Sequence, residues 1–134
     1  MKKRLFINIH YLEIGGVERA LLGLLSALDP ENVDIDLFVN QHTGEFMSLI
    51  PNYVNLLPEV PEYTCIERPI KNIVKEGHIG IVLRRMWAKL KHKRYLKTLT
   101  DEERKHDSSI FQYVANAVEG TLPSLEYLAE YDLA

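Results

Sequence analysis

Short apolar runs and one amphipathic stretch alternate over residues 1–40. An apolar, β-rich run over residues 4–10 predicts a buried strand, and residues 33–39 alternate and then turn wholly apolar, as in a strand that enters a parallel sheet. Between them, leucines at helical spacing predict a helix over residues 17–28, which ends at Asp29-Pro30. Together they predict a βαβ unit, whose crossover we expect to be right-handed.

The apolar runs become shorter after this unit. We expect a short helix over residues 44–51, a brief third strand over residues 54–57 and a loop over residues 58–70, which contains three prolines.

Helix-forming residues dominate from residue 70 to about residue 131. We expect a long helix over residues 79–99, a capped restart near Thr100, and a last short helix after Gly120 and Pro123. Residues 131–134 read as the beginning of a buried strand, so the fold is expected to be cut off within its architecture.

Composition adds broad limits. The 134 residues, 46% hydrophobic and 26% charged, suit one soluble globular domain, and the net charge of -3 argues against a general nucleic-acid binder. The single cysteine, Cys65, excludes an internal disulfide framework and a cysteine-rich metal site. The same cysteine usage leads us to expect a reducing, cytoplasmic setting. No apolar run approaches the roughly 20 residues of a membrane span.

The most direct chemical signal is the turn Gly15-Gly16 between the first strand and the first helix. Unpaired N–H groups and the positive end of the helix dipole attract phosphate groups at such a turn, and Glu18 lies in the first helical turn, where a carboxylate is favoured. A plain βα turn explains the same residues. A nicotinamide enzyme is the weaker interpretation, because the three-glycine fingerprint is absent and Asn40 stands where an acidic residue would hold the ribose.

The segment Gly15-Gly16-Val17-Glu18-Arg19-Ala20-Leu21-Leu22, followed by Leu28-Asp29 and Gly44-Glu45-Phe46, resembles the start of sugar-nucleotide-dependent glycosyltransferases of the GT-B fold, most of all the large retaining family. The resemblance covers residues 4–57 and returns at residues 131–134. It implies an α/β, Rossmann-like three-layer α/β/α domain with a short parallel sheet and a helix-rich second half. Residues 1–134 would be a partial N-terminal, acceptor-side domain with a helical insertion at about 66–130, without the C-terminal donor-binding domain.

The resemblance also implies roles for particular residues. Gly15 and Gly16 would approach the donor diphosphate, and Glu18 would reach toward the acceptor. It implies a nucleotide-sugar donor as substrate, no metal, and a glycan or lipid-linked acceptor in the synthesis of surface polysaccharide or glycolipid. The residues that clamp the donor belong to the family's C-terminal domain, so this chain alone is expected to be inactive.

Other polar residues have two interpretations each. His10 and Tyr11 follow the first strand, where either could bond a sugar hydroxyl or a phosphate, or else pack on the helix or face solvent. Arg19 could bind an anion or pair with Glu13 or Glu18. The remaining histidines lack metal-ligand spacing and the cysteine lacks a nearby histidine, so all five are predicted to be structural or surface residues: His42, His78, His92, His106 and Cys65.

A basic stretch without acidic residues covers residues 84–97, and its apolar residues recur at helical spacing. Such a helix suits an anionic membrane, to which the chain would bind peripherally on the inner face; a domain helix with a solvated basic face fits equally well, and nucleic acid is disfavoured. The residues predicted to face the membrane are Arg84, Arg85, Trp87, Lys89, Lys91, Lys93 and Arg94.

The sequence therefore predicts the acceptor side of a glycosyltransferase. The alternative is a stand-alone binding or assembly module without catalytic activity, whose open sheet edge would allow pairing between chains in a homo-oligomer.

Overall fold

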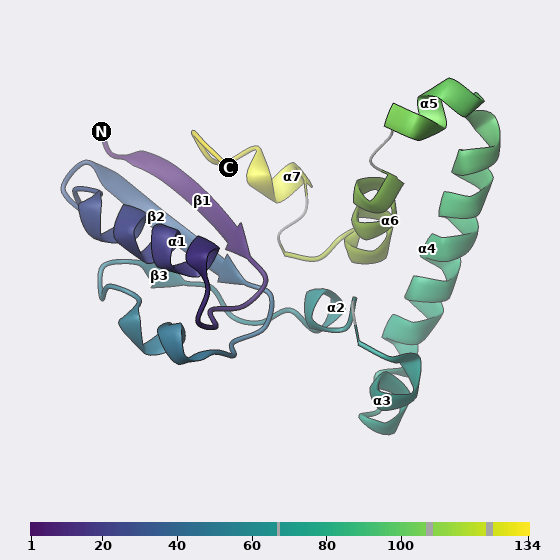
Figure 1. Cartoon of the computed structure of the whole chain (residues 1–134), viewed down its shortest axis with the longest axis horizontal. Coiled ribbons are helices and arrows are strands. Elements are labelled where there is room, and N and C mark those ends of the chain that lie inside the picture. Colours follow the sequence, from purple (N-terminus) through teal and green to yellow (C-terminus); the bar gives the residue numbers. More distant parts are fainter. Residues whose placement is uncertain (67, 107–108, 123–124) are drawn as a thin grey trace. The chain divides into compact units, whose positions relative to one another are not determined.

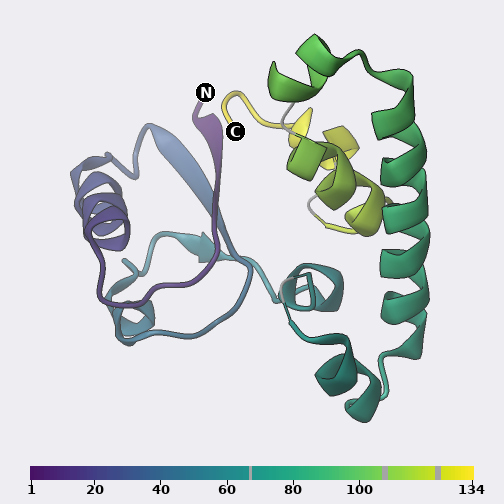
Figure 2. The ribbon, with the colours of Figure 1, turned by 45° about the vertical axis from the view of Figure 1, so that its right-hand side comes forward.

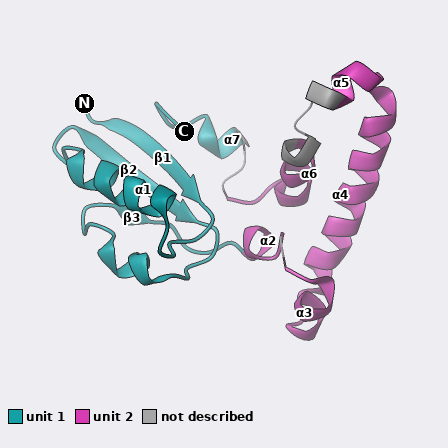
Figure 3. Cartoon of the chain, viewed as in Figure 1, with its two compact units in different colours: residues 1–60, 125–134 teal, residues 61–124 magenta. Residues whose placement is uncertain are grey.

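The computed structural model describes residues 1–66, 68–106, 109–122 and 125–134 (Figure 1). The chain forms two compact units, which Figure 3 separates by colour. The first unit contains Met1–Val60 and Leu125–Ala134, and the second contains Pro61–Ser124.

The first unit is an α/β structure with a short parallel sheet. Its strands are β1 (Lys3–Ile9), β2 (Val33–Val39) and β3 (Asn55–Leu56), which lie in the order β1-β2-β3 and pair in parallel. The helices are α1 (Gly16–Ala27) and α7 (Leu125–Leu128), and the short helix predicted over residues 44–51 is the 3-10 helix η1 (Glu45–Leu49). The predicted α/β class with a short parallel sheet is confirmed.

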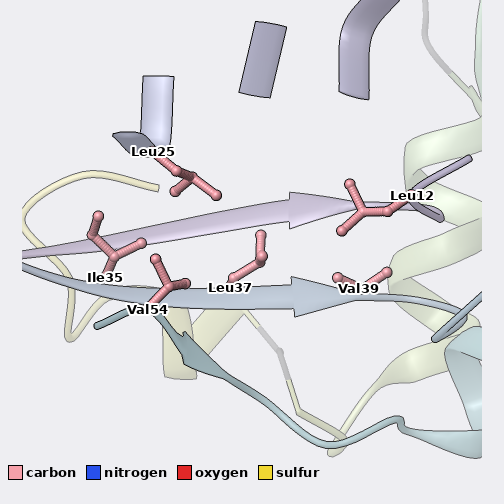
Figure 4. Packing of buried hydrophobic residues seen from close by; sticks show 6 residues of the cluster. All are labelled: Leu12, Leu25, Ile35, Leu37, Val39 and Val54. Atoms are coloured by element: carbon pink, nitrogen blue, oxygen red, sulfur yellow. The ribbon is translucent and has the colours of Figure 1, made fainter. Parts of the chain in front are cut away.

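The apolar core of this unit lies between the sheet and α1. Strand side chains alternate between faces, so Ile35, Leu37 and Val39 all point to the face that α1 covers. Figures 1 and 2 both show α1 along this face of the β1-β2 pair, and Figure 4 shows the buried cluster, which consists of Leu12, Leu25, Ile35, Leu37, Val39 and Val54. Each buried aliphatic side chain contributes about 1.5–3 kcal/mol to stability.

The opposite face of β1 is covered by aromatic residues near the chain end. Phe6 packs against the rings of Tyr127 and Tyr131, with centroid separations of 6.2 and 5.2 Å. The Tyr131 hydroxyl donates to Asp36 Oδ2 at 2.5 Å, and burial together with this hydrogen bond raises the pKa of Tyr131 well above its usual range. The guanidinium carbon of Arg4 lies over the Tyr131 ring, 4.7 Å from its centroid.

The residues after α7 return to the free edge of β1. Leu133 forms a parallel bridge with Leu5, and its carbonyl accepts a hydrogen bond from the Phe6 N–H at 2.8 Å. The strand expected over residues 131–134 is therefore present as one bridge. This contact places Leu133 and β2 on opposite edges of β1.

The second unit is helical and contains α2 (Pro61–Thr64), α3 (Ile70–Lys75), α4 (Ile79–Thr98), α5 (Asp101–His106) and α6 (Ser109–Val118). Its buried cluster contains Cys65, Ile73 and Val82. The predicted restart at Thr100 is confirmed, because the Glu103 carboxylate accepts a hydrogen bond from the Thr100 N–H at 2.7 Å. Pro123, expected to help separate the last helix, lies outside the described residues.

Candidate functional site

The loops that follow β1 and β2 are held together by backbone hydrogen bonds. The Asn40 N–H donates to the Ile9 carbonyl at 2.9 Å and the Gln41 N–H donates to the His10 carbonyl at 2.8 Å. Farther along, the Leu12 N–H donates to the Thr43 carbonyl at 3.0 Å, and the Leu12 carbonyl accepts from the Phe46 N–H at 2.9 Å. The β1–β2 pairing thus continues beyond the strands and fixes the first loop as far as Leu12.

Gly44 lets the second loop approach this closely. Its φ is 111°, a conformation that side chains with a Cβ rarely adopt. A Cβ at Gly44 would lie 2.1 Å from the Leu12 carbonyl oxygen and 2.5 Å from the Glu13 backbone nitrogen. Both neighbours are backbone atoms, so neither can rotate away.

The two glycines of the predicted phosphate turn differ in their surroundings. Gly15 is the N-cap of α1, and a Cβ there would lie 2.1 Å from Glu18 Oε2. The Glu18 carboxylate therefore folds back over Gly15 at the positive end of the helix. Gly16 is exposed, and a Cβ there would meet no atom within 4 Å. The space beside Gly16 is open to a ligand.

A hollow beside the first loop is lined by Glu13, Ile14, Gly44 and Glu45, with a volume of about 370 Å³. Two of its lining residues, Glu13 and Glu45, carry carboxylates, and the carboxylate of Glu18, from the first turn of α1, lies at Gly15 on the same loop. Carboxylates accept hydrogen bonds from hydroxyl groups and repel phosphate groups. This part of the site suits a polyhydroxyl ligand better than an anion.

A polar network lies at the carboxyl ends of β1 and β2. Asn8 Nδ2 donates to the Phe38 carbonyl oxygen at 3.2 Å and to Asn40 Oδ1 at 2.7 Å. Asn40 is 6% exposed, and its Nδ2 lies 3.2 Å from Nδ1 of the exposed His10. Tyr11 is also exposed, with its ring centroid 6.5 Å from that of His10. The structure thus brings His10 together with two asparagines that sequence analysis did not place in the site.

The remaining polar residues expected near the turn contribute less. Arg19 is exposed and forms no ion pair within the part of the chain that the structure describes, so neither Glu13 nor Glu18 is its partner. His42 lies in the second loop, where its N–H donates to Glu59 Oε1 at 2.5 Å.

The other predicted structural residues belong to the second unit. Cys65 is 2% exposed, and burial raises the pKa of its thiol, which disfavours the reactive thiolate. His78 is the N-cap of α4, and the His92 ring packs on Tyr113 at a centroid separation of 6.1 Å. The side chain of His106 lies outside the described residues. Among residues 1–66, 68–106, 109–122 and 125–134, no group of three or more His, Cys, Asp or Glu side chains is placed to hold a metal ion.

The basic residues of α4 have three different environments. Arg85, expected on the membrane-facing surface, is buried instead, because its guanidinium donates to the carbonyls of Cys65 and Arg68, both at 2.8 Å. Two others have acidic neighbours: Arg84 Nη1 lies 3.4 Å from Glu62 Oε1, and Lys91 Nζ lies 3.7 Å from Glu119 Oε2. The same Lys91 Nζ lies 4.5 Å from the centroid of the Trp87 ring. Within the described residues no ion-pair partner is found for Lys89, Lys93 and Arg94.

An apolar stripe lies on α4 opposite its buried residues. Val82, Arg85 and Ala88 are buried, whereas Leu83 is 61% and Trp87 is 53% exposed. The stripe also includes Ile79, Met86 and Leu90. At helical spacing, Lys93, Arg94 and Lys97 lie on the same face of α4, nearer its C-terminal end. None of the helices in the described part of the chain has the length and apolarity needed to cross a bilayer.

Comparison with known proteins identifies no relative. No family model matches the chain, and no curated protein or solved structure matches it.

Replacement of Gly44 by alanine should destabilise the first unit. The positive φ and the contact with the Leu12 backbone should together lower the free energy of unfolding by at least about 2 kcal/mol. Chemical denaturation measures this change. Gly23→Ala in the exposed interior of α1, where a Cβ meets no atom within 4 Å, is the control and should raise stability by about 0.5–1 kcal/mol. Equal stability of Gly44→Ala and the unmodified chain would contradict the described loop contact.

Proposed function

We propose that this chain is the acceptor-side part of a nucleotide-sugar-dependent glycosyltransferase of the GT-B type, acting in surface polysaccharide or glycolipid synthesis. The observation that carries the proposal is the group of accessible polar side chains at the carboxyl end of β1, held beside an open glycine turn. His10, Tyr11 and Glu13 lie on one loop whose backbone is fixed by the loop after β2, and the half-exposed Glu18 follows in the first turn of α1.

The position of this loop supports a ligand site. In open parallel sheets, ligands bind outside the carboxyl ends of the strands, where chain connections leave toward opposite edges. Here β2 lies on one edge of β1 and Leu133 bridges the other. The carboxyl end of β1 is the corresponding position, and the residues that follow it are His10–Gly16.

The chemistry of the loop supports an acceptor more than a donor. Glu13 and Glu45 line the hollow, and carboxylates are good partners for sugar hydroxyl groups. A diphosphate would meet these negative charges, so we expect the chain to bind a nucleoside diphosphate weakly through the N–H groups near Gly16. In the proposed full enzyme, the missing cationic groups come from a second domain, as the family resemblance implies.

The exposed face of α4 supports a membrane-associated acceptor. Its apolar stripe includes a tryptophan, and Lys93 and Arg94 continue the face without acidic partners among the described residues. Aromatic residues favour the bilayer interface, and each lysine or arginine near an anionic surface contributes about 1 kcal/mol. We therefore propose that this face lies on an anionic membrane, with the enzyme bound peripherally.

Replacement of Gly16 by valine should abolish diphosphate binding without unfolding the chain. The new side chain projects into open space, so it blocks a ligand and not a protein neighbour. Calorimetric titration of the full chain with UDP, GDP and their sugars measures the effect, and at least one of these ligands should bind weakly to the unmodified chain.

The matched control is Gly23→Val, because Gly23 lies in the same helix and a Cβ there also meets no atom within 4 Å. This variant should bind as the unmodified chain does. Equal binding by both valine variants would place the ligand elsewhere, and no binding of any nucleotide to the unmodified chain would contradict a donor contact at this turn.

Removal of two charges from the exposed face of α4 should weaken membrane binding. The partition constant onto phosphatidylserine-containing vesicles, measured by sedimentation, should fall about tenfold or more for Lys93→Ala/Arg94→Ala, because two attractive charges are lost. Phosphatidylcholine vesicles should sediment little protein in either case.

Lys71→Ala/Lys75→Ala removes the same charge from exposed positions of α3 and serves as the control. Equal losses in the two double variants would indicate unspecific charge attraction. Unchanged sedimentation of Lys93→Ala/Arg94→Ala would remove α4 from the proposed membrane surface.

A further inference from the structure

The polar network at the end of β1 starts from an atom that can only accept a hydrogen bond. This atom is the Phe38 carbonyl oxygen, and Asn8 lies 3.2 Å from it. The nearer atom of the Asn8 amide must be the nitrogen, since an oxygen there would face another oxygen.

The orientation of the Asn8 amide determines that of the Asn40 amide. The same Asn8 nitrogen lies 2.7 Å from the Asn40 amide, so Asn40 must present its oxygen to Asn8. Its nitrogen then faces His10 Nδ1 at 3.2 Å. An amide NH₂ group only donates, so His10 Nδ1 must accept and carry no proton. The neutral ring therefore carries its proton on Nε2.

We propose that Asn8 and Asn40 are positioning residues that fix His10 as an Nε2–H donor at the carboxyl end of β1. Two observations support a role toward a ligand. Asn40 is buried and holds one ring nitrogen, whereas His10 is exposed and Nε2 has no hydrogen-bond partner among the described residues. A ligand atom that meets Nε2–H must be a hydrogen-bond acceptor.

The class of ligand follows from this polarity. Within the proposed transferase function, on which this step rests, the acceptor is an oxygen atom of a sugar hydroxyl or of a phosphate group. The fixed tautomer adds a donor to a loop whose carboxylates only accept, so a sugar that reaches both groups can use its hydroxyls in both senses.

The tautomer can be measured without any ligand. Long-range ¹H–¹⁵N correlation spectra of the full ¹⁵N-labelled chain at about pH 8.5, where an ordinary imidazole is neutral, distinguish a protonated from an unprotonated ring nitrogen. His10→Gln identifies the His10 signals by their loss. The expected result for the unmodified chain is an unprotonated Nδ1 and a protonated Nε2.

Two variants test the relay, by which we mean the hydrogen-bond chain from Asn8 through Asn40 to His10 that sets the tautomer. Asn40→Asp places an acceptor beside Nδ1 and should move the proton from Nε2 to Nδ1. Asn8→Asp leaves only an acceptor beside Asn40, so the Asn40 amide should reverse and the proton should move in the same way without any contact between residue 8 and His10. Because position 8 is exposed, the new carboxylate can turn to water and away from the Phe38 carbonyl oxygen. Asn52→Asp, at an exposed position of the same unit, adds an equal charge and should leave the tautomer unchanged.

A protonated Nδ1 in the unmodified chain, or an unchanged tautomer in both relay variants, would overturn the proposal. UDP and maltotriose are then added separately. A change in the His10 Nε2 resonance with UDP would identify a phosphate oxygen as the acceptor of the Nε2–H bond, and a change with maltotriose would identify a sugar hydroxyl oxygen. A predicted tautomer that neither probe perturbs would leave the relay standing and would contradict the transferase function instead.

Discussion

The first unit depends on the way in which one residue, Leu12, is held. Its side chain is fully buried in the core between the sheet and α1, and both its N–H and its carbonyl are used by the loop after β2. This arrangement requires Gly44, because any Cβ there would collide with the Leu12 backbone. Apolar burial and backbone hydrogen bonds therefore anchor the centre of the first loop at the same point.

The candidate site consists of the residues on either side of this anchor. His10 lies just before Leu12, at the end of the paired segment, and Glu13 follows it at the hollow. Beyond them, Gly15 is the N-cap of α1, whose Leu25 packs in the same core as Leu12. A loop held in this way can present polar side chains at fixed positions, which lowers the entropy cost of binding a ligand.

Hydrophobic periodicity is sufficient to predict β1, β2 and α1, because each turns apolar residues toward the core, whereas helix-forming residues predict α4. The same periodicity could not distinguish the faces of α4. Apolar residues occur on two sides of this helix, and only packing reveals that Val82 is buried while Leu83 is exposed. Composition predicts Arg85 at the surface, whereas its guanidinium donates to the carbonyls of Cys65 and Arg68.

The site was predictable in location and less so in composition. A Gly-Gly turn after a strand indicates the first loop, which contains His10 and leads into the helical turn that contains Glu18. The asparagine pair was missed because Asn8 and Asn40 meet only through the strand register, although each interrupts or ends an apolar strand in the sequence. The sequence gives no sign of the contact between Gly44 and Leu12, because this contact arises between loops far apart in the chain.

Pairing with the second loop fixes the first loop at Leu12, and the candidate site depends on this pairing. Native-state hydrogen exchange at the Leu12 amide tests it most directly, because this N–H donates to the Thr43 carbonyl outside any regular strand. Protection of this amide should be comparable to that of the central amides of β1 and β2. Exchange at the rate of an exposed, unbonded amide would show that the loop is not held, and would contradict a preformed site at the end of β1.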